Sequence, residues 1–293
     1  MEKSLFELYD SFRKGLINRR DFAKKVLLAT GGLTAASQLT GLIAEAQAAP
    51  QGDIVIEEGT YPSGMDDIRY YLAKPGQGGP FLTMIVIHEI FGLSDFITDV
   101  VRLFARTGFL AMAPALPEGG GGAPGQPSLP DGKHAPWMLE TLRTGVAAPP
   151  PSEIIKLIDG FNFLAQRKDV DAAHIGSVGF CWGGARSFTL ATVLDQLWVA
   201  VVFYGSTPPL EDLANAEAPV LGLYGALDNA SPTSITGRAA ETARAMRSLG
   251  KEFEWEVYNM APHAFFRDGS QVSTSRAAMI AWELVLDFLQ RHV

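Results

Sequence analysis

The chain has 293 residues, 47% of them hydrophobic, and its 32 acidic side chains outnumber 24 basic ones to give a formal net charge of −8 at pH 7. This composition excludes a disordered chain and a collagen, and the acidic balance argues against a nucleic-acid-binding protein, which needs a basic face to meet phosphates. The single cysteine, Cys181, excludes an internal disulfide framework and a zinc site built from several cysteines.

The first 48 residues have the order of an export signal. A basic segment with the pair Arg19-Arg20 precedes an uncharged apolar run at 26–44, and Ala46-Gln47-Ala48 follows as a small-residue cleavage motif, with Ala44-Glu45-Ala46 as the alternative. Glycines and polar residues interrupt the run, which disfavours a permanent membrane span. The paired arginines resemble a twin-arginine signal. We therefore expect residues 1–48 to be a signal peptide read by export machinery, and the mature protein to be periplasmic or otherwise extracytoplasmic, with no stable membrane anchor after processing.

In residues 49–293, apolar runs typical of strands alternate with stretches of helical periodicity. An opening antiparallel pair is predicted at 54–57 and 68–73, and the continuous apolar run at 81–87 indicates a strand buried on both faces. Further strands are predicted at 109–113, 175–180, 199–204, 220–224 and 253–258. Helices are predicted from Ser94 to Gly108, from Ser152 through Leu164, and at 183–194, 234–249 and 275–290. The last helix is expected to bury Met279, Trp282, Leu286 and Leu289.

This alternation predicts an α/β protein with a mostly parallel central sheet and helices on both faces. Residues 117–150 are rich in glycine and proline and are predicted to form a long surface loop or lid. The active site of such a sheet lies at the carboxyl ends of its strands. The residues that follow positions 87, 180, 224 and 258 are therefore the candidates for chemistry.

Cys181 follows one of these strands, within Gly179-Phe180-Cys181-Trp182-Gly183. A nucleophile on a sharp turn between a strand and a helix needs small neighbours because the backbone is tight there, and both glycines meet that need. The helix N-terminus favours the thiolate. The backbone amides of Trp182 and Ile90 are predicted to bind the developing oxyanion. In the simpler interpretation, Cys181 is a small buried hydrophobic residue.

Asp228 and His263 follow two later strands, so the chain order is nucleophile, acid, base, as in α/β-hydrolases. His263 would take the proton of Cys181, and Asp228 would hold the imidazole in the useful tautomer. Alternatively, Asp228 is a turn residue and His263 a surface histidine. The other histidines are interpreted as structural or surface residues: His88, His134, His174 and His292. No histidine pair has zinc spacing, so no metal site is expected.

Together these segments resemble the dienelactone hydrolase family (carboxymethylenebutenolidases), α/β-hydrolases with a cysteine nucleophile. The resemblance spans about residues 55–292. It is carried by His-Glu-Ile-Phe-Gly at 88–92, Gly-Phe-Cys-Trp-Gly-Gly at 179–184, Asp228, and His-Ala-Phe-Phe-Arg at 263–267.

The resemblance implies an α/β-hydrolase fold for residues 49–293 and a catalytic triad of Cys181, His263 and Asp228. It further implies that Glu89 is an auxiliary carboxylate that pairs with the thiol in the resting site and helps to produce the thiolate when substrate arrives. Arg267 would bind a substrate carboxylate, for which its guanidinium fork is suited. The simpler alternatives are a salt bridge from Glu89 to Arg102 or Arg106, and an exposed loop charge at Arg267. The family's second carboxylate-binding arginine has no clear counterpart, because Arg143 is the sole arginine in 117–150 and does not align.

We therefore expect a hydrolase of small-molecule lactones or esters, enol lactones above all, that works through a cysteinyl acyl-enzyme and needs no cofactor or metal. The substrate is expected to carry a carboxylate if Arg267 has the implied role, and no nucleic-acid partner is expected. Two alternatives stay open: a general carboxylesterase or thioesterase of the same fold, and a non-catalytic exported binding protein.

Overall fold

The computed structural model describes residues 53–116, 152–228 and 235–293. The predicted signal peptide and the predicted lid at 117–150 lie outside these residues, as do His134 and Arg143. The expectations for them therefore remain predictions.

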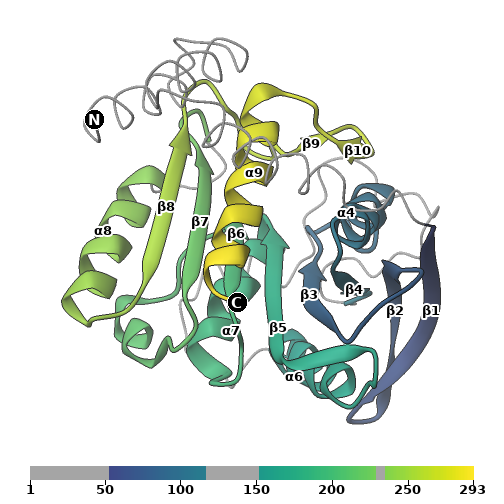
Figure 1. Cartoon of the computed structure of the whole chain (residues 1–293). Coiled ribbons are helices and arrows are strands. Elements are labelled where there is room, and N and C mark those ends of the chain that lie inside the picture. Colours follow the sequence, from purple (N-terminus) through teal and green to yellow (C-terminus); the bar gives the residue numbers. More distant parts are fainter. Residues whose placement is uncertain (1–52, 117–151, 229–234) are drawn as a thin grey trace, which may run out of the picture. The chain divides into compact units, whose positions relative to one another are not determined.

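An eight-stranded sheet is the centre of the described domain, with the strand order β1-β2-β4-β3-β5-β6-β7-β8 (Figure 1). β1 pairs with β2, and β2 with β4, in antiparallel fashion, whereas every neighbouring pair from β4 to β8 is parallel. The mostly parallel sheet predicted from the alternation of elements is thereby confirmed. The strands are β1 (Ile54–Ser63), β2 (Asp66–Pro75), β3 (Phe81–Ile87), β4 (Leu110–Pro114), β5 (Val170–Phe180), β6 (Ala200–Phe203), β7 (Val220–Gly225) and β8 (Phe253–Tyr258).

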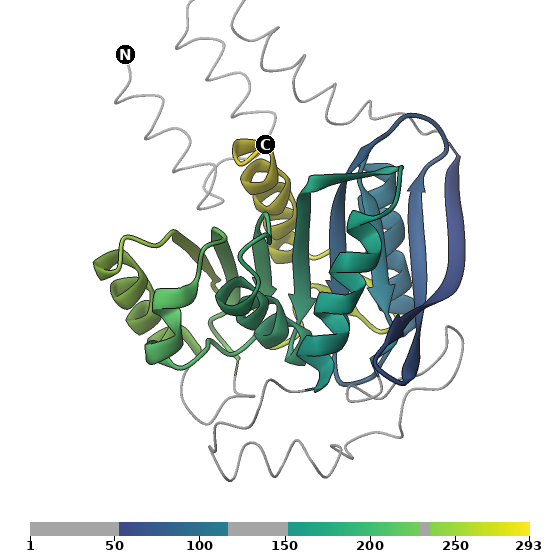
Figure 2. The ribbon, with the colours of Figure 1, turned by 90° about the horizontal axis from the view of Figure 1, so that it is seen from below.

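Helices cover both faces of this sheet (Figure 2). α4 (Asp95–Arg106) and α9 (Arg276–Arg291) pack on one face, and α6 (Ser152–Ala165), α7 (Trp182–Val193) and α8 (Ile235–Ser248) lie on the other. A 3-10 helix, η2 (Leu210–Asn215), follows β6, and a short hairpin of β9 (Arg267–Asp268) and β10 (Gln271–Val272) precedes α9.

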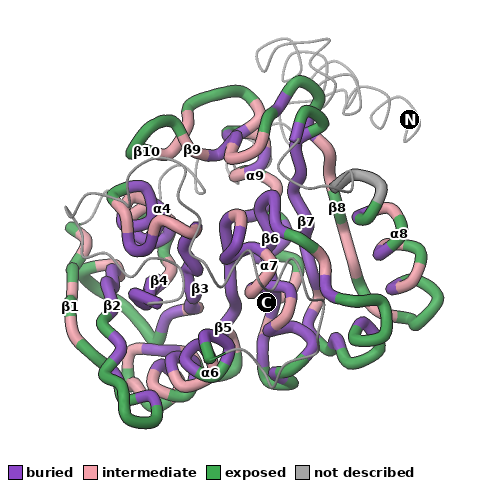
Figure 3. Tube along the Cα trace, turned by 180° about the vertical axis from the view of Figure 1, so that it is seen from behind, coloured by how far each residue is buried: buried purple, intermediate pink, exposed green. Residues whose placement is uncertain are grey.

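The sheet separates two hydrophobic cores. Successive residues of β3 alternate between them: Met84 and Val86 contribute to the core under α4 and α9, and Ile85 and Ile87 to the core under α6 and α7. Figure 3 shows the central strands buried along most of their length. Burial on both faces explains why the sequence of β3 is an unbroken apolar run.

The burial predicted for α9 is confirmed for Leu289, which is 0% exposed, but is wrong for Met279. Met279 is 57% exposed, and Trp282 and Leu286 are only partly buried. The buried side of the helix consists of Ala278, Ala281, Val285, Phe288 and Leu289. The two alanines let the helix backbone approach the sheet closely. Because alanine is only weakly hydrophobic, a prediction of the buried side of a helix from hydrophobicity alone gives such residues little weight.

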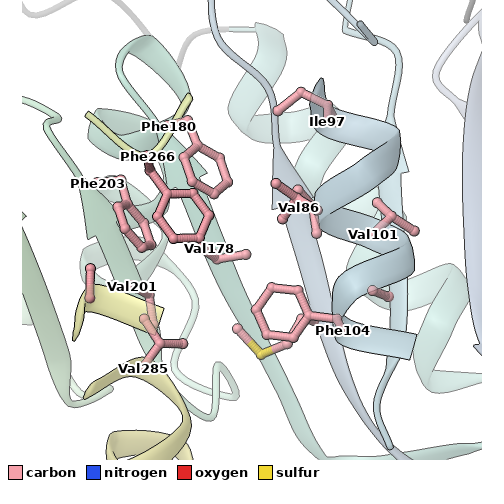
Figure 4. Packing of buried hydrophobic residues seen from close by; sticks show 14 of the residues in the cluster. Val86, Ile97, Val101, Phe104, Val178, Phe180, Val201, Phe203, Phe266 and Val285 are labelled. Atoms are coloured by element: carbon pink, nitrogen blue, oxygen red, sulfur yellow. The ribbon is translucent and has the colours of Figure 1, made fainter. Parts of the chain in front are cut away.

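Three aromatic side chains pack directly under the end of the sheet where chemistry was expected (Figure 4). The ring centroids of Phe180 and Phe203 lie 4.9 Å apart, and those of Phe203 and Phe266 lie 4.6 Å apart. Phe180 immediately precedes Cys181, and Phe266 lies three positions after His263. This cluster therefore anchors two segments that are distant in sequence to one rigid base.

Candidate active site

Cys181 occupies a strained turn between β5 and α7. Its backbone angles are φ 56° and ψ −113°, a region that residues other than glycine rarely adopt. The amide of Cys181 donates a 2.9 Å hydrogen bond to the carbonyl of Phe203 on β6, and its own carbonyl accepts one of 3.2 Å from the amide of Ala185. The turn is thus held by the sheet on one side and by the helix on the other, and it leaves the thiol partly exposed.

Two glycines make this turn possible because neighbouring backbone occupies the space of a side chain. A Cβ on Gly179 would lie 1.9 Å from the carbonyl oxygen of Gly183. A Cβ on Gly183 would lie 2.3 Å from the carbonyl oxygen of Ile87 and 2.5 Å from that of His88. The sequence argument for small residues beside the nucleophile therefore has a direct geometric basis.

The close approach of Gly183 to the end of β3 also places the segments that carry the two predicted oxyanion donors, Trp182 and Ile90, near each other. Trp182 is the first residue of α7, and the amides of a helix's first turn point out of its N-terminus. Gly183 packs against the end of β3, so this N-terminus lies against the segment that continues to Ile90. The two predicted donor segments are thus brought together beside Cys181.

His263 and Asp228 are joined by a hydrogen bond. Nδ1 of His263 donates to Oδ2 of Asp228 at 2.7 Å, and the Asp228 side chain is 1% exposed. Asp228 follows β7 and His263 follows β8. Gly225 brings these two segments into contact, since a Cβ there would lie 2.4 Å from the carbonyl oxygen of Ala261.

Cys181 lies close enough to His263 to act on the pKa of its imidazole, so the three predicted triad residues are brought together. Burial of the imidazole is the largest single effect on its pKa and lowers it. Hydrogen bonds to Asp228 and Cys181, together with the charges of both, outweigh burial and raise the pKa of His263 to about 10. The site therefore favours a protonated imidazole beside the sulfur.

Glu89 and Arg267 form an ion pair beside this triad. Nη1 of Arg267 donates to Oε2 of Glu89 at 2.9 Å, and the Glu89 side chain is 2% exposed. Burial raises the pKa of Glu89, and the charge of Arg267 opposes that effect. Arg102, one alternative partner considered for Glu89, instead pairs with Asp99 at 2.6 Å.

Arg267 is held in place and is not a free surface charge. Its Nε donates to the carbonyl of Gly269 at 2.6 Å, and its guanidinium lies 4.8 Å from the ring centroid of Phe91. The expected pairing of Glu89 with the Cys181 thiol is therefore wrong for this structure, in which the buried carboxylate is instead compensated by the cation of Arg267.

His88 has a structural place, as predicted. It is fully buried, its Nε2 accepts a 3.0 Å hydrogen bond from the amide of Leu116, and its ring stacks on Trp182 at 5.7 Å.

The sequence analysis missed Arg186. Its guanidinium lies 4.4 Å from the centroid of the Trp182 ring and pairs with the buried carboxylate of Glu153 at 2.7 Å. Arg186 lies four positions after Trp182 on α7, and this i,i+4 spacing could have identified it.

Within residues 53–116, 152–228 and 235–293, no three His, Cys, Asp or Glu side chains are grouped so that they could hold a metal ion. None of the helices in these same ranges is long and apolar enough to cross a membrane.

Comparison with known proteins shows the family of this chain. Residues 68–293 match the model of the dienelactone hydrolase family. An Escherichia coli O157:H7 protein named "Putative carboxymethylenebutenolidase" is 34% identical over 275 residues, which cover 90% of this chain and 96% of that protein. A Bradyrhizobium protein named "Probable 2-oxo-3-(5-oxofuran-2-ylidene)propanoate lactonase" is 29% identical over 237 residues, covering 76% and 89%. The crystal structure titled "Putative Dienelactone Hydrolase", from Klebsiella pneumoniae, superimposes with a TM-score of 0.68 at 28% identity, covering 82% of this chain and 99% of that one.

Proposed function

Because this chain belongs to the dienelactone hydrolase family and is a carboxylic ester hydrolase, we propose that it opens lactones and cleaves activated esters through an acyl-enzyme on Cys181. One arrangement supports this proposal above all others. A cysteine on a strained turn at a helix N-terminus lies against an imidazole that is itself hydrogen-bonded to a buried carboxylate.

In the proposed mechanism, the Cys181 thiolate attacks the carbonyl carbon of the substrate and forms a carbon–sulfur bond. The oxyanion accepts hydrogen bonds from the amides of Trp182 and Ile90. The carbon–oxygen bond then breaks, and the departing oxygen takes the proton of the His263 imidazolium.

Deacylation reverses these roles. Neutral His263 takes a proton from water as the water oxygen attacks the thioester. The carbon–sulfur bond breaks, the carboxylic acid leaves, and the Cys181 thiolate is restored beside the protonated imidazole. Asp228 keeps the imidazole oriented through both steps.

Enol lactones and activated esters are the proposed substrate class because a thiolate is itself a good leaving group. The tetrahedral intermediate moves forward only when the departing oxygen is stabilised at least as well as the sulfur. An enolate or a phenolate meets this condition, whereas an amide nitrogen does not. Equal turnover of an amide and its matching enol ester would contradict this assignment.

Arg267 is proposed to bind a carboxylate on the substrate. It is a cation held against Glu89 at the edge of the triad, and its side chain remains 23% exposed. The Bradyrhizobium relative is named for a lactone that bears a carboxylate, which fits this chemistry. A substrate carboxylate would compete with Glu89 for the guanidinium.

The direct test is mass spectrometry of the protein within milliseconds of mixing with a dienelactone or with p-nitrophenyl acetate. We expect the acyl mass on the peptide that contains Cys181, and because this is the only cysteine of the chain, no other thiol can carry it. The Cys181→Ala variant should form no adduct and lose turnover. Turnover by that variant at the wild-type rate would refute the nucleophile.

The same measurements separate the two alternatives. High activity on p-nitrophenyl esters with little on dienelactone would favour a general carboxylesterase. A wild-type protein that hydrolyses neither would favour a binding role.

We further propose that the enzyme is exported through its first 48 residues, on the order of basic, apolar and small-residue segments there.

A further inference from the structure

Tyr204 stands at the end of β6, the strand that lies between the one leading to Cys181 and the one leading to Asp228. It is 1% exposed and has a φ of 43°, an unfavourable angle for a bulky side chain. Its amide donates a 2.8 Å hydrogen bond to the carbonyl of Leu223 on β7. Surrounding structure thus imposes a strained conformation at a strand end next to the site, which is where strain most often serves function.

The hydroxyl of Tyr204 is buried and makes no hydrogen bond to any group in the part of the chain that the structure describes. A buried hydroxyl without a partner destabilises a fold, so native proteins rarely retain one without a reason. The ring lies against the catalytic base, since the centroids of Tyr204 and His263 are 5.0 Å apart in an edge-to-face arrangement.

Tyr204 lies close enough to the charged groups of the site for their charges to act on its hydroxyl. Burial is the main cause that raises the pKa of Tyr204 well above its ordinary value, and the charges of Glu89 and Cys181 raise it further. The hydroxyl therefore stays protonated and can act as a donor throughout the working pH range. Of the charges that act on it, Glu89 has the largest effect.

Tyr224, at the same level of the neighbouring strand β7, provides a comparison. It is also fully buried, and its hydroxyl likewise lacks a hydrogen-bond partner among the described groups. Burial alone raises the pKa of Tyr224, with no contribution from a charged neighbour. The two tyrosines thus share residue type and burial, but the charges of the site act on Tyr204 and not on Tyr224.

The Glu89 carboxylate would require a hydrogen-bond donor if it lost Arg267 as its partner. Its ion-pair partner is Arg267, and its side chain is 2% exposed. If a substrate carboxylate occupied the guanidinium, Glu89 would be left as a buried charge without compensation, which is strongly unfavourable. A hydrogen bond to the charged form offsets part of that penalty.

The geometry points to Tyr204 as a positioning residue whose hydroxyl donates a hydrogen bond to the Glu89 carboxylate when a substrate carboxylate takes over Arg267. This inference rests on the proposed function, including the role of Arg267. It explains why a buried hydroxyl beside the catalytic base is kept without a partner in the resting site: its acceptor becomes available only when substrate is bound.

The test compares Tyr204→Phe with Tyr224→Phe on a dienelactone, which carries a carboxylate, and on p-nitrophenyl acetate, which does not. Tyr204→Phe removes only an unpartnered oxygen, so its Tm should equal or exceed that of the wild type. We expect kcat/KM on the dienelactone to fall about tenfold or more, the scale of a hydrogen bond to a charged group. The loss on p-nitrophenyl acetate should be several-fold smaller. Tyr224→Phe should match the wild type on both substrates.

The pH profile supplies a second readout. Removal of a donor to the charged carboxylate raises the pKa of Glu89, so the acidic limb of the dienelactone profile should move to higher pH in Tyr204→Phe. An equal loss on both substrates, or no difference between the two variants, would overturn the inference.

These results also distinguish the two proposals. If the wild type hydrolyses both substrates, Cys181→Ala is inactive, and Tyr204→Phe behaves as Tyr224→Phe, only the role of Tyr204 fails. If the wild type hydrolyses neither substrate, the proposed function fails and this inference fails with it.

Discussion

The imidazole of His263 and the carboxylate of Asp228 lie 2.7 Å apart although 35 positions separate them in the chain. The contact exists because β7 and β8 are parallel neighbours, so the segments that follow them emerge at the same edge of the sheet. Cys181 reaches the same edge from β5.

Asp228→Asn should lower kcat by about 10²–10⁴-fold, because the amide can no longer hold the imidazole in its tautomer or offset its charge. Steady-state hydrolysis of p-nitrophenyl acetate measures the loss. Asp171→Asn is the matched control, since Asp171 forms a 2.8 Å hydrogen bond with His174 away from the site. If both variants retained wild-type activity, Asp228 would have no part in catalysis.

The stability of the fold should decline on the alkaline side through His263. The folded pKa of about 10 lies above the ordinary value of 6.5, so protonation of His263 stabilises the folded state fully below pH 6.5. This contribution is lost as the pH rises toward 10. Urea unfolding at pH 6, 8 and 10 should show the free energy of unfolding of the wild type falling toward that of His263→Gln. His174→Gln serves as the control, and a gap between the wild type and His263→Gln that does not narrow with pH would contradict the assignment.

Gly179→Ala should destabilise the protein by about 3 kcal/mol or more and displace Cys181, because the new Cβ would lie 1.9 Å from backbone that cannot yield. Gly250→Ala is a control in which nothing lies within 4 Å of the new Cβ and only a left-handed φ of 69° is strained. It should cost about 1–2 kcal/mol and leave activity intact. Chemical denaturation and ester hydrolysis measured together test both, and a fully active Gly179→Ala would refute the close approach.

The buried pair of Arg186 and Glu153 should show strong coupling. Arg186→Met leaves the carboxylate of Glu153, whose side chain is 5% exposed, without its partner and should cost about 3–5 kcal/mol. The double variant with Glu153→Met removes the stranded charge and should recover most of that loss. A double-mutant cycle by urea unfolding measures the coupling, and additive losses would show that the pair is not coupled.

The proposed export depends on Arg19 and Arg20. Their joint replacement by lysine keeps the charge but removes the twin-arginine motif, so precursor should accumulate in the cytoplasm. Fractionation and intact-mass analysis would show this, and for the wild type they should give a mature chain that begins after Ala48 or Ala46. Lys24→Arg together with Lys25→Arg is the control. Equal export of all three proteins would exclude a twin-arginine route.

Much of this architecture could be predicted from local patterns. Because β3 and β6 are buried on both faces, their sequences are continuous apolar runs that predict strands. Gly179 and Gly183 predict the turn at Cys181 because no side chain fits at either position. The side of α9 that is buried could not be predicted in the same way, because Ala278 and Ala281 are selected by close packing against the sheet. β5 also begins at Val170, five residues earlier than its apolar run suggested.

By itself the sequence determined the order of strands and helices, the sharp turn at Cys181, and which residues follow each strand, since backbone sterics and side-chain burial are local properties. Only the tertiary structure decided which of those residues meet: Glu89 with Arg267, Arg186 with Trp182, and Tyr204 with His263. These contacts depend on the lateral order of the strands and on the space left among packed side chains. Neither property produces a periodic pattern of hydrophobic residues from which it could be predicted.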